Sequence, residues 1–199
     1  TTKSDTEVLL HGYEQWGVDL LQRVRGMFTF VIWDKNKQEL FGARDHFGIK
    51  PFYYAKMNGT FMYASEIKSL LRHPDFVKEL NAEALKPYMT FQYPAIGETF
   101  FKGVYKLPEG HYFTYRDGKM DIHRYYDEDF REGKQKLGEL VNSIDQTVCD
   151  SVKAHQIADV EVGSFLSSGV DSSYVAAVAR PQHTYSIGFG KGTYNESQQ

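Results

Sequence analysis

A run of small polar residues with the sequence LSSGVDSS fills positions 166–173, between an apolar segment and one with helical spacing. A strand that leads through small residues into a helix leaves backbone N–H groups free, and the helix dipole adds partial positive charge there. Gly169 lets a ligand approach the backbone closely. Four serines add hydroxyl donors: Ser167, Ser168, Ser172 and Ser173. The spacing predicts an anion site, commonly for phosphate, or alternatively an ordinary strand–turn–helix connection with Asp171 in its first turn.

Three other constellations are excluded. Residues 166–173 lack the G-x-x-x-x-G-K-[ST] spacing of a Walker A loop, and no Lys follows Gly169. They also lack the G-x-S-x-G pattern of a hydrolase nucleophile elbow. The seven histidines show no metal-ligand spacing.

The elements that would position this run form a strand–helix–strand pattern. Apolar spacing predicts a strand over residues 161–166, a helix over 171–180 and a strand over 183–189. This order is typical of a parallel α/β sheet, in which ligands bind beyond the carboxyl ends of the strands. A preceding helix is predicted from one apolar stripe: Leu137, Val141, Ile144, Val148 and Val152. We interpret Cys149, beside this stripe, as a partly buried structural thiol.

Short helices are predicted at the start of the chain. Ser4 and Glu7 have the spacing of a capping box, in which each side chain bonds to the other residue's backbone. Val8, Leu9 and Tyr13 would form the apolar face of this helix, and Gly17 would end it. A second helical stretch is predicted over residues 20–25.

Antiparallel strands are predicted for most of the first half. Alternating aromatic and β-branched residues indicate strands over 27–34 and 38–44 and a hairpin over 51–65, with Asn58-Gly59 as its turn. Ser65 would cap a helix over 66–72, and a helix containing a proline is predicted over 80–94. Further strands are predicted over 103–116 and 119–127. The charged residues 128–135 form a predicted linker.

The composition resembles that of an ordinary globular protein. The 199 residues suffice for one large domain or two modest ones, and the net charge of −3 argues against nucleic acid and anionic membranes as partners. No apolar stretch is long enough to span a bilayer, and no export leader opens the chain. The single cysteine excludes an internal disulfide and is typical of a reducing compartment, so we expect a cytoplasmic location.

The run at 166–173 resembles the S-G-G-x-D-S pyrophosphate loop of ATP pyrophosphatases. The whole chain is similar to the glutamine-hydrolysing asparagine synthetases: DVEVGSFLSSGVDSS resembles D-V-P-V-G-x-x-L-S-G-G-L-D-S-S, and RGMFTFVIWDKNKQELFGARDHFGIKPFYY resembles the family stretch N-G-M-F-A-F … A-R-D-R-F-G-I-K-P-L-Y-Y. SDTEVLLHGYEQWG and YASEIKSLLRHP match as well. The resemblance covers essentially every residue in the family's order.

The resemblance implies two domains. Residues 1–127 would form part of a class II glutamine amidotransferase domain, an α+β fold with αββα layers of the Ntn-hydrolase type. After the linker at 128–135, residues 136–199 would begin a parallel α/β nucleotide-binding domain. The implied enzyme hydrolyses glutamine to ammonia and uses ATP and Mg²⁺ to adenylate the side chain of aspartate, which ammonia then converts to asparagine. A homodimer is also possible.

Site residues follow from matched positions. Asp5 falls where the family binds the α-amino group of glutamine, although it could equally lie in a capped first turn. Ile187 and Gly188 fall where the family contacts adenine, although they could be core strand residues. The ATP and pyrophosphate site would comprise Leu166, Ser167, Ser168, Gly169, Val170, Asp171, Ser172 and Ser173. The resemblance gives the motif ARDHFGIKP at 43–51 a structural role, and the metal ligands stay unknown at this point.

Three departures from the family pattern are visible. The chain opens with Thr1, whereas the family nucleophile is an amino-terminal cysteine that precedes the matched region. We therefore expect no catalytic residue among these 199 residues, and we expect the isolated chain to be an inactive internal fragment. Ser168 replaces a glycine of the loop and Glu161 replaces a proline. Two alternatives remain: a related synthetase such as a β-lactam-forming enzyme, and a non-catalytic binding or regulatory relative.

Overall fold

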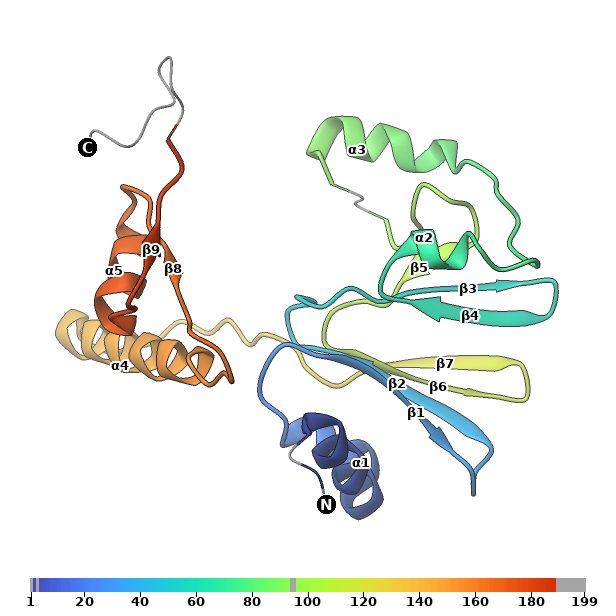
Figure 1. Ribbon diagram of the computed structural model, residues 1–199, viewed down its shortest axis with the longest axis horizontal. Coiled ribbons are helices and arrows are strands. Elements are labelled where there is room, and N and C mark those ends of the chain that lie inside the picture. The colour runs from blue at the N-terminus through green and yellow to red at the C-terminus, as the bar shows by residue number, and fades with distance from the viewer. Residues whose placement is uncertain (1, 3, 94–95, 189–199) are drawn as a thin grey trace. The chain divides into compact units, whose positions relative to one another are not determined.

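The computed structural model describes residues 2, 4–93 and 96–188 of the chain (Figure 1). Its contacts divide the chain into two units, Thr1–Asp129 and Phe130–Gln199. Antiparallel hairpins dominate the first unit, and the second contains a parallel strand pair. Within the described residues, no helix has the length and hydrophobicity that crossing a membrane requires.

Two antiparallel sheets form the centre of the first unit. One has the order β1–β2–β6–β7, with the bounds Thr29–Asp34, Glu39–Arg44, His111–Arg116 and Lys119–Arg124. The other has the order β4–β3–β5, with the bounds Thr60–Ala64, Tyr53–Met57 and Val104–Lys106. Positive φ angles at Asn58 and Gly59 confirm the turn predicted between β3 and β4, and Asp117 and Gly118 form a turn of the same kind between β6 and β7.

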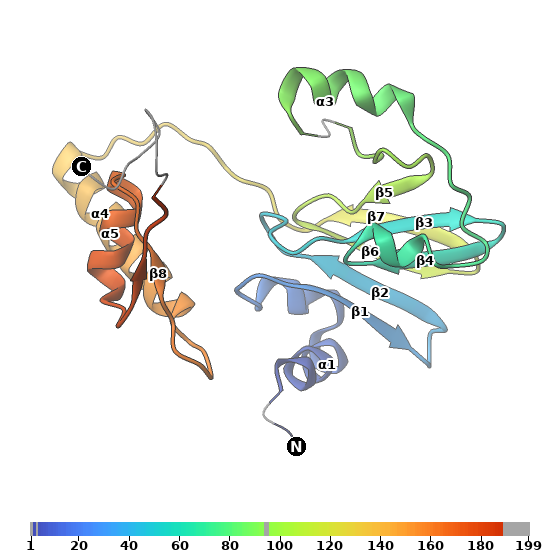
Figure 2. The ribbon, with the colours of Figure 1, turned by 45° about the horizontal axis from the view of Figure 1, so that its top comes forward.

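Helices cover the outer faces of this pair of sheets. The helix α1 (Asp5–Trp16) and the 3₁₀ helix η1 (Gly17–Gln22) lie against the first sheet. On the side of the second sheet are α2 (Ile67–Leu70), the 3₁₀ helix η2 (Ala82–Ala84) and α3 (Leu85–Phe91). Figures 1 and 2 show α1 and α3 on opposite sides of the two sheets.

Three apolar clusters correspond to the three interfaces between these layers. Tyr13 of α1 packs on Phe41 of β2, and their rings stack with centroids 5.0 Å apart. Phe113 of β6 lies in a cluster shared by both sheets. Met62 of β4 and Leu70 of α2 belong to the third cluster, on the outer face of the second sheet. Because successive strand residues face opposite sides, each sheet can serve two interfaces at once, and the predicted αββα layering is confirmed.

Gly42 allows the close approach of the two sheets. A Cβ atom at this position would lie 2.3 Å from the ring of Phe113. We expect Gly42→Ala to lower the free energy of unfolding by about 1–3 kcal/mol through overpacking. Urea unfolding would measure the change. Gly97→Ala is the control, because its Cβ would meet nothing within 4 Å and should change stability by less than about 0.5 kcal/mol. Equal stabilities of the two variants would contradict the prediction.

Two predictions about the first helices are wrong. Val8 is 66% exposed, so the buried face of α1 consists of Leu9, Gly12 and Tyr13 without it. The second helical stretch is the 3₁₀ helix η1, which starts at Gly17 rather than at residue 20. Gly17 ends α1 as predicted, with a φ of 58°. Because Gly17 is also the first residue of η1, no loop separates α1 from η1.

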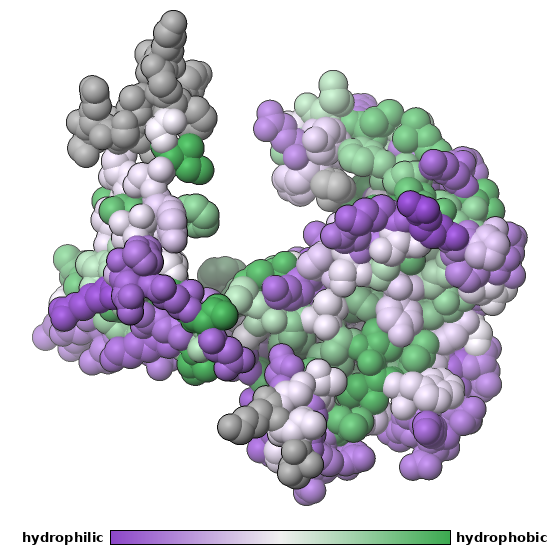
Figure 3. Space-filling model, in the orientation of Figure 1, coloured by the Kyte–Doolittle hydropathy of each residue, from purple (hydrophilic) through white to green (hydrophobic). Residues whose placement is uncertain are grey.

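The predicted helices after β4 are shorter than expected. Glu66, not Ser65, is the N-cap residue of the short helix α2, and no side chain caps it. The helix predicted over 80–94 is reduced to η2 and α3. Asn81 caps η2, because its side chain accepts from the Glu83 amide, and the same side chain donates to the Thr99 carbonyl. Pro94 lies outside the described residues. Figure 3 shows hydrophobic residues exposed over α3, where Met89 is 80% exposed.

The strand predicted over 103–116 is in fact two strands in different sheets. β5 ends at Lys106 and β6 begins at His111. Pro108 has no amide to donate to a ladder, and Gly110 takes a φ of 65°. These two residues let the chain cross from one sheet to the other. Strand β1 also begins at Thr29, two residues later than predicted.

The second unit contains α4 (Leu137–His155), β8 (Ser164–Phe165), α5 (Val170–Ala179) and β9 (Thr184–Tyr185). β8 and β9 pair in parallel, which confirms the predicted strand–helix–strand order, although both strands are shorter than expected. Phe189, the predicted end of the second strand, lies outside the described residues. The helix predicted from the apolar stripe is present, but Leu137 is 78% exposed and the described part of α4 has no buried residue. Cys149 is partly buried, as predicted.

Candidate functional site

Residues 166–169 connect β8 to α5 at the carboxyl end of the parallel strand pair. The Leu166 amide donates to the Tyr185 carbonyl over 2.8 Å, and this bond extends the ladder one residue beyond β8. The chain then leaves the sheet and enters α5 at Val170. The predicted loop therefore lies where open parallel sheets bind their ligands.

Hydroxyl groups inside the loop bond to one another. The Ser167 and Ser172 Oγ atoms are 2.8 Å apart, and Ser172 Oγ accepts from the Ser167 amide over 3.1 Å. Ser167 Oγ accepts from the Gly169 amide over 3.2 Å, and Ser173 Oγ donates to the Gly169 carbonyl over 2.9 Å. These contacts hold the loop closed on the first turn of α5.

The first turn of α5 supplies the donors that remain. Helix geometry gives the amides of Val170, Asp171 and Ser172 no intrahelical acceptor. The partial positive charge of the helix is concentrated at the same point. Val170 is 84% exposed, so this end of the helix is accessible to solvent. An anion placed here would meet several N–H donors at once.

The dihedral angles explain how the loop accommodates a serine at the departure from the family pattern. Ser168 is not among the residues with positive φ, so replacing glycine there causes no left-handed strain. Gly169 has a φ of −76° and a ψ of 152°, which other residues also adopt. Its small size matters instead, because a Cβ would lie 3.3 Å from Ser167 Oγ.

The loop carries a negative side chain and no positive one. Asp171 lies in the first turn of α5, and residues 164–175 contain neither Lys nor Arg. Within residues 2, 4–93 and 96–188, no three His, Cys, Asp or Glu side chains gather as a metal site would require. A polyphosphate bound here would need a cation to neutralise its charge, and few protein side chains are present to coordinate that cation. Mg²⁺ suits such a site, because it is commonly bound by one or two carboxylates together with phosphate oxygens. Asp171 fits that role.

The second predicted segment lies beside the loop. Ser186 follows β9, and its hydroxyl donates to the Leu166 carbonyl over 2.6 Å. Ile187 is 70% exposed, so the alternative of a core strand residue is wrong for it, and Gly188 is exposed as well. The structure thus brings 166–173 and 187–188 together at one edge of the strand pair.

Three polar residues that the sequence analysis did not single out support this arrangement. The Tyr174 hydroxyl donates to the Asp145 carboxylate and joins α5 to α4. That hydrogen bond, together with desolvation, raises the pKa of Tyr174. At the other end of α5, the Gln156 side chain donates to the Ala179 carbonyl over 2.7 Å. The signal that could have identified Tyr174 and Asp145 in the sequence is a polar residue on the face of a helix that packs against another helix. The carboxylate of Glu161, the other departure from the family pattern, lies 3.3 Å from Nε2 of His183.

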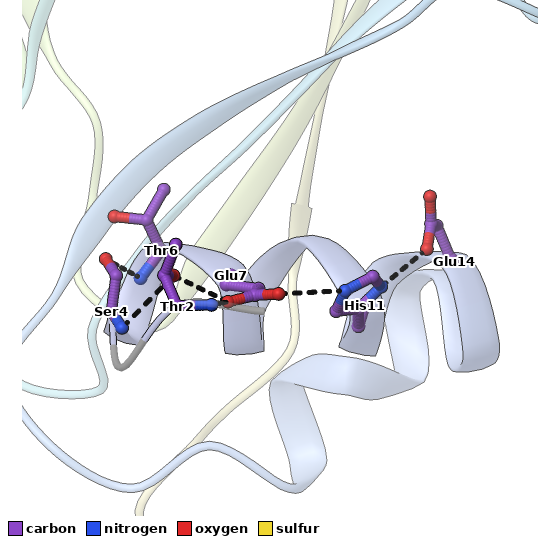
Figure 4. A network of polar contacts seen from close by, with 6 residues as sticks. All are labelled: Thr2, Ser4, Thr6, Glu7, His11 and Glu14. Carbon is purple, nitrogen blue, oxygen red and sulfur yellow. Dashed lines mark hydrogen bonds and ion pairs between the residues drawn. The ribbon is translucent and has the colours of Figure 1, made fainter.

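Asp5 lies at the start of α1 in the first unit. Its Oδ1 atom accepts from the Thr6 amide over 2.8 Å, and the residue is exposed. Ser4 caps the helix by accepting from the same Thr6 amide, and the Glu7 carboxylate bonds to Thr2 (Figure 4). Ser4 is therefore the N-cap residue as predicted, but the reciprocal Ser4–Glu7 bonds of a capping box are replaced by these two contacts. The first-turn position of Asp5 is therefore observed.

His11 joins two carboxylates on the exposed face of α1 (Figure 4). Its Nδ1 atom lies 2.9 Å from Glu14 and its Nε2 atom 3.6 Å from Glu7. The hydrogen bond with Glu14 is the largest cause that raises the pKa of His11 above its ordinary value. Because the folded pKa is raised, the stabilising contribution is full below the unfolded pKa and is lost as the pH rises through the folded pKa.

We expect Glu14→Gln to lower the pKa of His11, because the variant removes the charge and the main acceptor of the imidazolium. An NMR titration of the His11 ring protons would measure the shift. Glu39→Gln, on β2, is the control and should leave the His11 pKa unchanged. An unaltered His11 pKa in Glu14→Gln would show that the contact is not made in solution.

The motif at 43–51 contains two buried charged residues that bind backbone groups. Arg44 is 2% exposed and donates to the carbonyls of Lys50, Leu107 and Gly48. Burial is the main cause that lowers the pKa of Arg44. Asp45 is 1% exposed and accepts from amides of its own loop. Both charged groups are thus engaged by backbone groups, and this agrees with the structural role that the resemblance implies.

Two known protein families match different parts of this chain. Residues 1–126 match the family described as the glutamine amidotransferase domain, which is more than half of the chain. The chain belongs to the glutamine amidotransferase domain family. Residues 143–199, which include the candidate loop, match the family described as asparagine synthase. The amidotransferase assignment thus covers the sandwich, and the synthase match covers most of the second unit.

Curated relatives of this amidotransferase chain include proteins named asparagine synthetase. The chain is 41% identical to asparagine synthetase [glutamine-hydrolyzing] 1 of Bacillus subtilis over 98% of its own length and 32% of that protein. It is 38% identical to a putative asparagine synthetase [glutamine-hydrolyzing] of Mycobacterium bovis, again over 98% of the chain and 32% of the relative. The chain therefore spans about a third of these relatives. Among solved structures, glutamine phosphoribosylpyrophosphate amidotransferase from B. subtilis is 19% identical, with a TM-score of 0.42, over 98% of this chain and 41% of that one.

Proposed function

We propose that the chain is part of a glutamine-hydrolysing asparagine synthetase. The observation that carries this proposal is the loop of residues 166–173, which follows a parallel strand and lies within the region matched by asparagine synthase. The amidotransferase region that precedes it supplies the reason for pairing ammonia release with a synthetase. Residues 1–127 would be the amidotransferase part, 128–135 the linker and 136–199 the start of the synthetase part.

The chemistry requires activation of a carboxylate. An ionised carboxylate is a poor acyl electrophile, whereas its mixed anhydride with AMP has a good leaving group. The side-chain carboxylate of aspartate attacks the α-phosphorus of ATP, the bond to the bridging oxygen breaks, and pyrophosphate leaves. Ammonia then attacks the acyl carbon, which yields asparagine and AMP. Positioning and charge stabilisation are the contributions expected of the protein.

Each element of the candidate site has a role in this proposal. The amides of Val170, Asp171 and Ser172, with the hydroxyls of Ser167, Ser168 and Ser173 and the backbone of Gly169, would bind the departing pyrophosphate. Leu166, Ile187 and Gly188 would contact the rest of ATP. Asp171 would hold Mg²⁺ together with phosphate oxygens, and the ion would neutralise their charge. The observed bonds within the loop keep these donors in one place before the nucleotide arrives.

Asp5 would bind the α-amino group of glutamine in the amidotransferase part. Its exposed carboxylate uses Oδ1 for the helix amide, and a carboxylate has further acceptor sites for an ammonium group. We assign no catalytic residue to this chain. Thr1 lies outside the described residues, and we do not propose it as a nucleophile. A cytoplasmic location and a homodimer belong to the same proposal.

Product analysis tests the proposal. With the full-length protein that contains these residues, we expect AMP and pyrophosphate to form only when aspartate and ATP are present, with glutamine or ammonia as nitrogen donor. Formation of ADP and phosphate would exclude adenylation. The purified 199-residue chain should release no glutamate from glutamine; detectable release would refute that part of the proposal.

A further inference from the structure

Ser186 makes a bond between the two segments of the candidate site. Its hydroxyl donates to the Leu166 carbonyl over 2.6 Å, although twenty residues separate the two in sequence. Ser186 is the first residue after β9, and Leu166 is the first residue after β8. The bond therefore lies at the point where both strands end.

This side-chain bond takes the place of the next backbone bond in the ladder. The Ser164 amide donates to His183 over 3.1 Å, and the Leu166 amide donates to Tyr185 over 2.8 Å. In a parallel ladder the following bond would run from the amide of Ile187 to the carbonyl of Leu166. Among the described residues that acceptor receives the Ser186 hydroxyl instead.

Two consequences follow for the ends of the strands. Both backbone polar groups of Leu166 are bonded to the neighbouring strand segment, since its amide donates to the Tyr185 carbonyl and its carbonyl accepts from the Ser186 hydroxyl. Ile187 is released from the ladder and is 70% exposed. The chain can therefore leave the sheet after β9 while Leu166, the residue before the loop, keeps both of its backbone hydrogen bonds.

We propose that Ser186 is a positioning residue for nucleotide binding. The inference rests on the proposed function, because it assumes that 166–173 and 187–188 bind one ATP molecule. From Ser167 onward the loop is braced by its own bonds to Ser172, so its remaining freedom is a rotation at Leu166. The Ser186 bond restrains that rotation and sets the distance between the phosphate donors and the segment at 187–188.

Kinetics of three variants of the full-length protein test the inference. Ser186→Ala should raise the KM for ATP in AMP formation by about two- to tenfold, the range expected for one hydrogen bond, while kcat changes less. Ser186→Thr keeps a hydroxyl at the same position and should restore the KM. Ser164→Ala is the matched control, because within the described part of the chain its hydroxyl bonds only to the carbonyl of the next residue in β8. An unchanged KM in Ser186→Ala, or no rescue by threonine, would overturn the role.

Hydrogen–deuterium exchange separates this inference from the proposed function. In the absence of nucleotide, Ser186→Ala should speed exchange at the amides of residues 166–169 relative to wild type, and Ser164→Ala should not. This measurement needs no catalysis. If the wild-type protein makes no AMP but the exchange changes as expected, the proposed function fails while the Ser186 bond stands. Equal exchange in wild type and Ser186→Ala, or faster exchange throughout α5, would overturn the inference.

Discussion

Asp171→Ala in the full-length protein should reduce asparagine formation at least about 100-fold and leave glutamine hydrolysis unchanged. Asp171 is the only acidic residue of the loop at 166–173 and the candidate ligand of the cation that accompanies ATP. Removing a negative charge from a helix N-terminus would by itself strengthen the attraction for phosphate. A large loss therefore points to a lost cation ligand rather than to the field of the helix. Assays of AMP, pyrophosphate and glutamate measure both reactions.

A Mg²⁺ titration sharpens this test. The residual activity of Asp171→Ala should require a higher Mg²⁺ concentration than wild type, whereas Asp159→Ala should follow the wild-type curve. Asp159 is exposed and lies before β8, outside the loop. Equal loss of synthesis and glutamine hydrolysis in Asp171→Ala would instead indicate a folding defect, and circular dichroism would identify it.

Asp45→Asn should lower the free energy of unfolding of the first unit by about 2–3 kcal/mol. The Asp45 carboxylate is 1% exposed and accepts from the amides of Phe47, Ile49 and Lys50. An asparagine keeps the shape, but it removes the charge and turns one acceptor into a donor that faces an amide. The three loop amides would then lose the charged acceptor that they share. The buried Arg44 guanidinium would also lose the nearby opposite charge of Asp45.

Urea unfolding followed by tryptophan fluorescence measures this effect selectively. Both tryptophans, Trp16 and Trp33, lie in the first unit, so their signal reports on it alone. Asp121→Asn is the control: its contact with Lys119 is solvent-exposed and should contribute no more than about 1 kcal/mol. A stability of Asp45→Asn within about 1 kcal/mol of wild type would show that the buried carboxylate is dispensable.

The rules that predicted correctly were those that act over a few residues. Asn58-Gly59 specified a hairpin turn because both positions of such a turn need positive φ. Gly17 ended α1 for a similar reason. The run at 166–173 connects a strand to a helix as its composition indicated. Its proposed ligand came from a family resemblance, and no local rule distinguishes a phosphate loop from an ordinary connection.

The errors arose where distant contacts compete with local preference. The strand predicted over 103–116 is divided between the two sheets because β5 and β6 pair with different neighbours. The helix predicted over 80–94 begins only after Asn81, whose side chain caps η2 and also bonds to the Thr99 carbonyl, a contact that no local pattern predicts. Val8 has an apolar side chain at helical spacing and is still 66% exposed, because the sheet contacts a narrower face of α1.

The order of elements, the turn positions and the type of each half are therefore written in local sequence, because dihedral preferences and apolar periods act between near neighbours. The division of strands between two sheets, the burial of Arg44 and Asp45, and the bond from Ser186 to Leu166 were decided only by the folded chain. Each depends on groups far apart in sequence that reach hydrogen-bonding or packing distance only after the strands have paired.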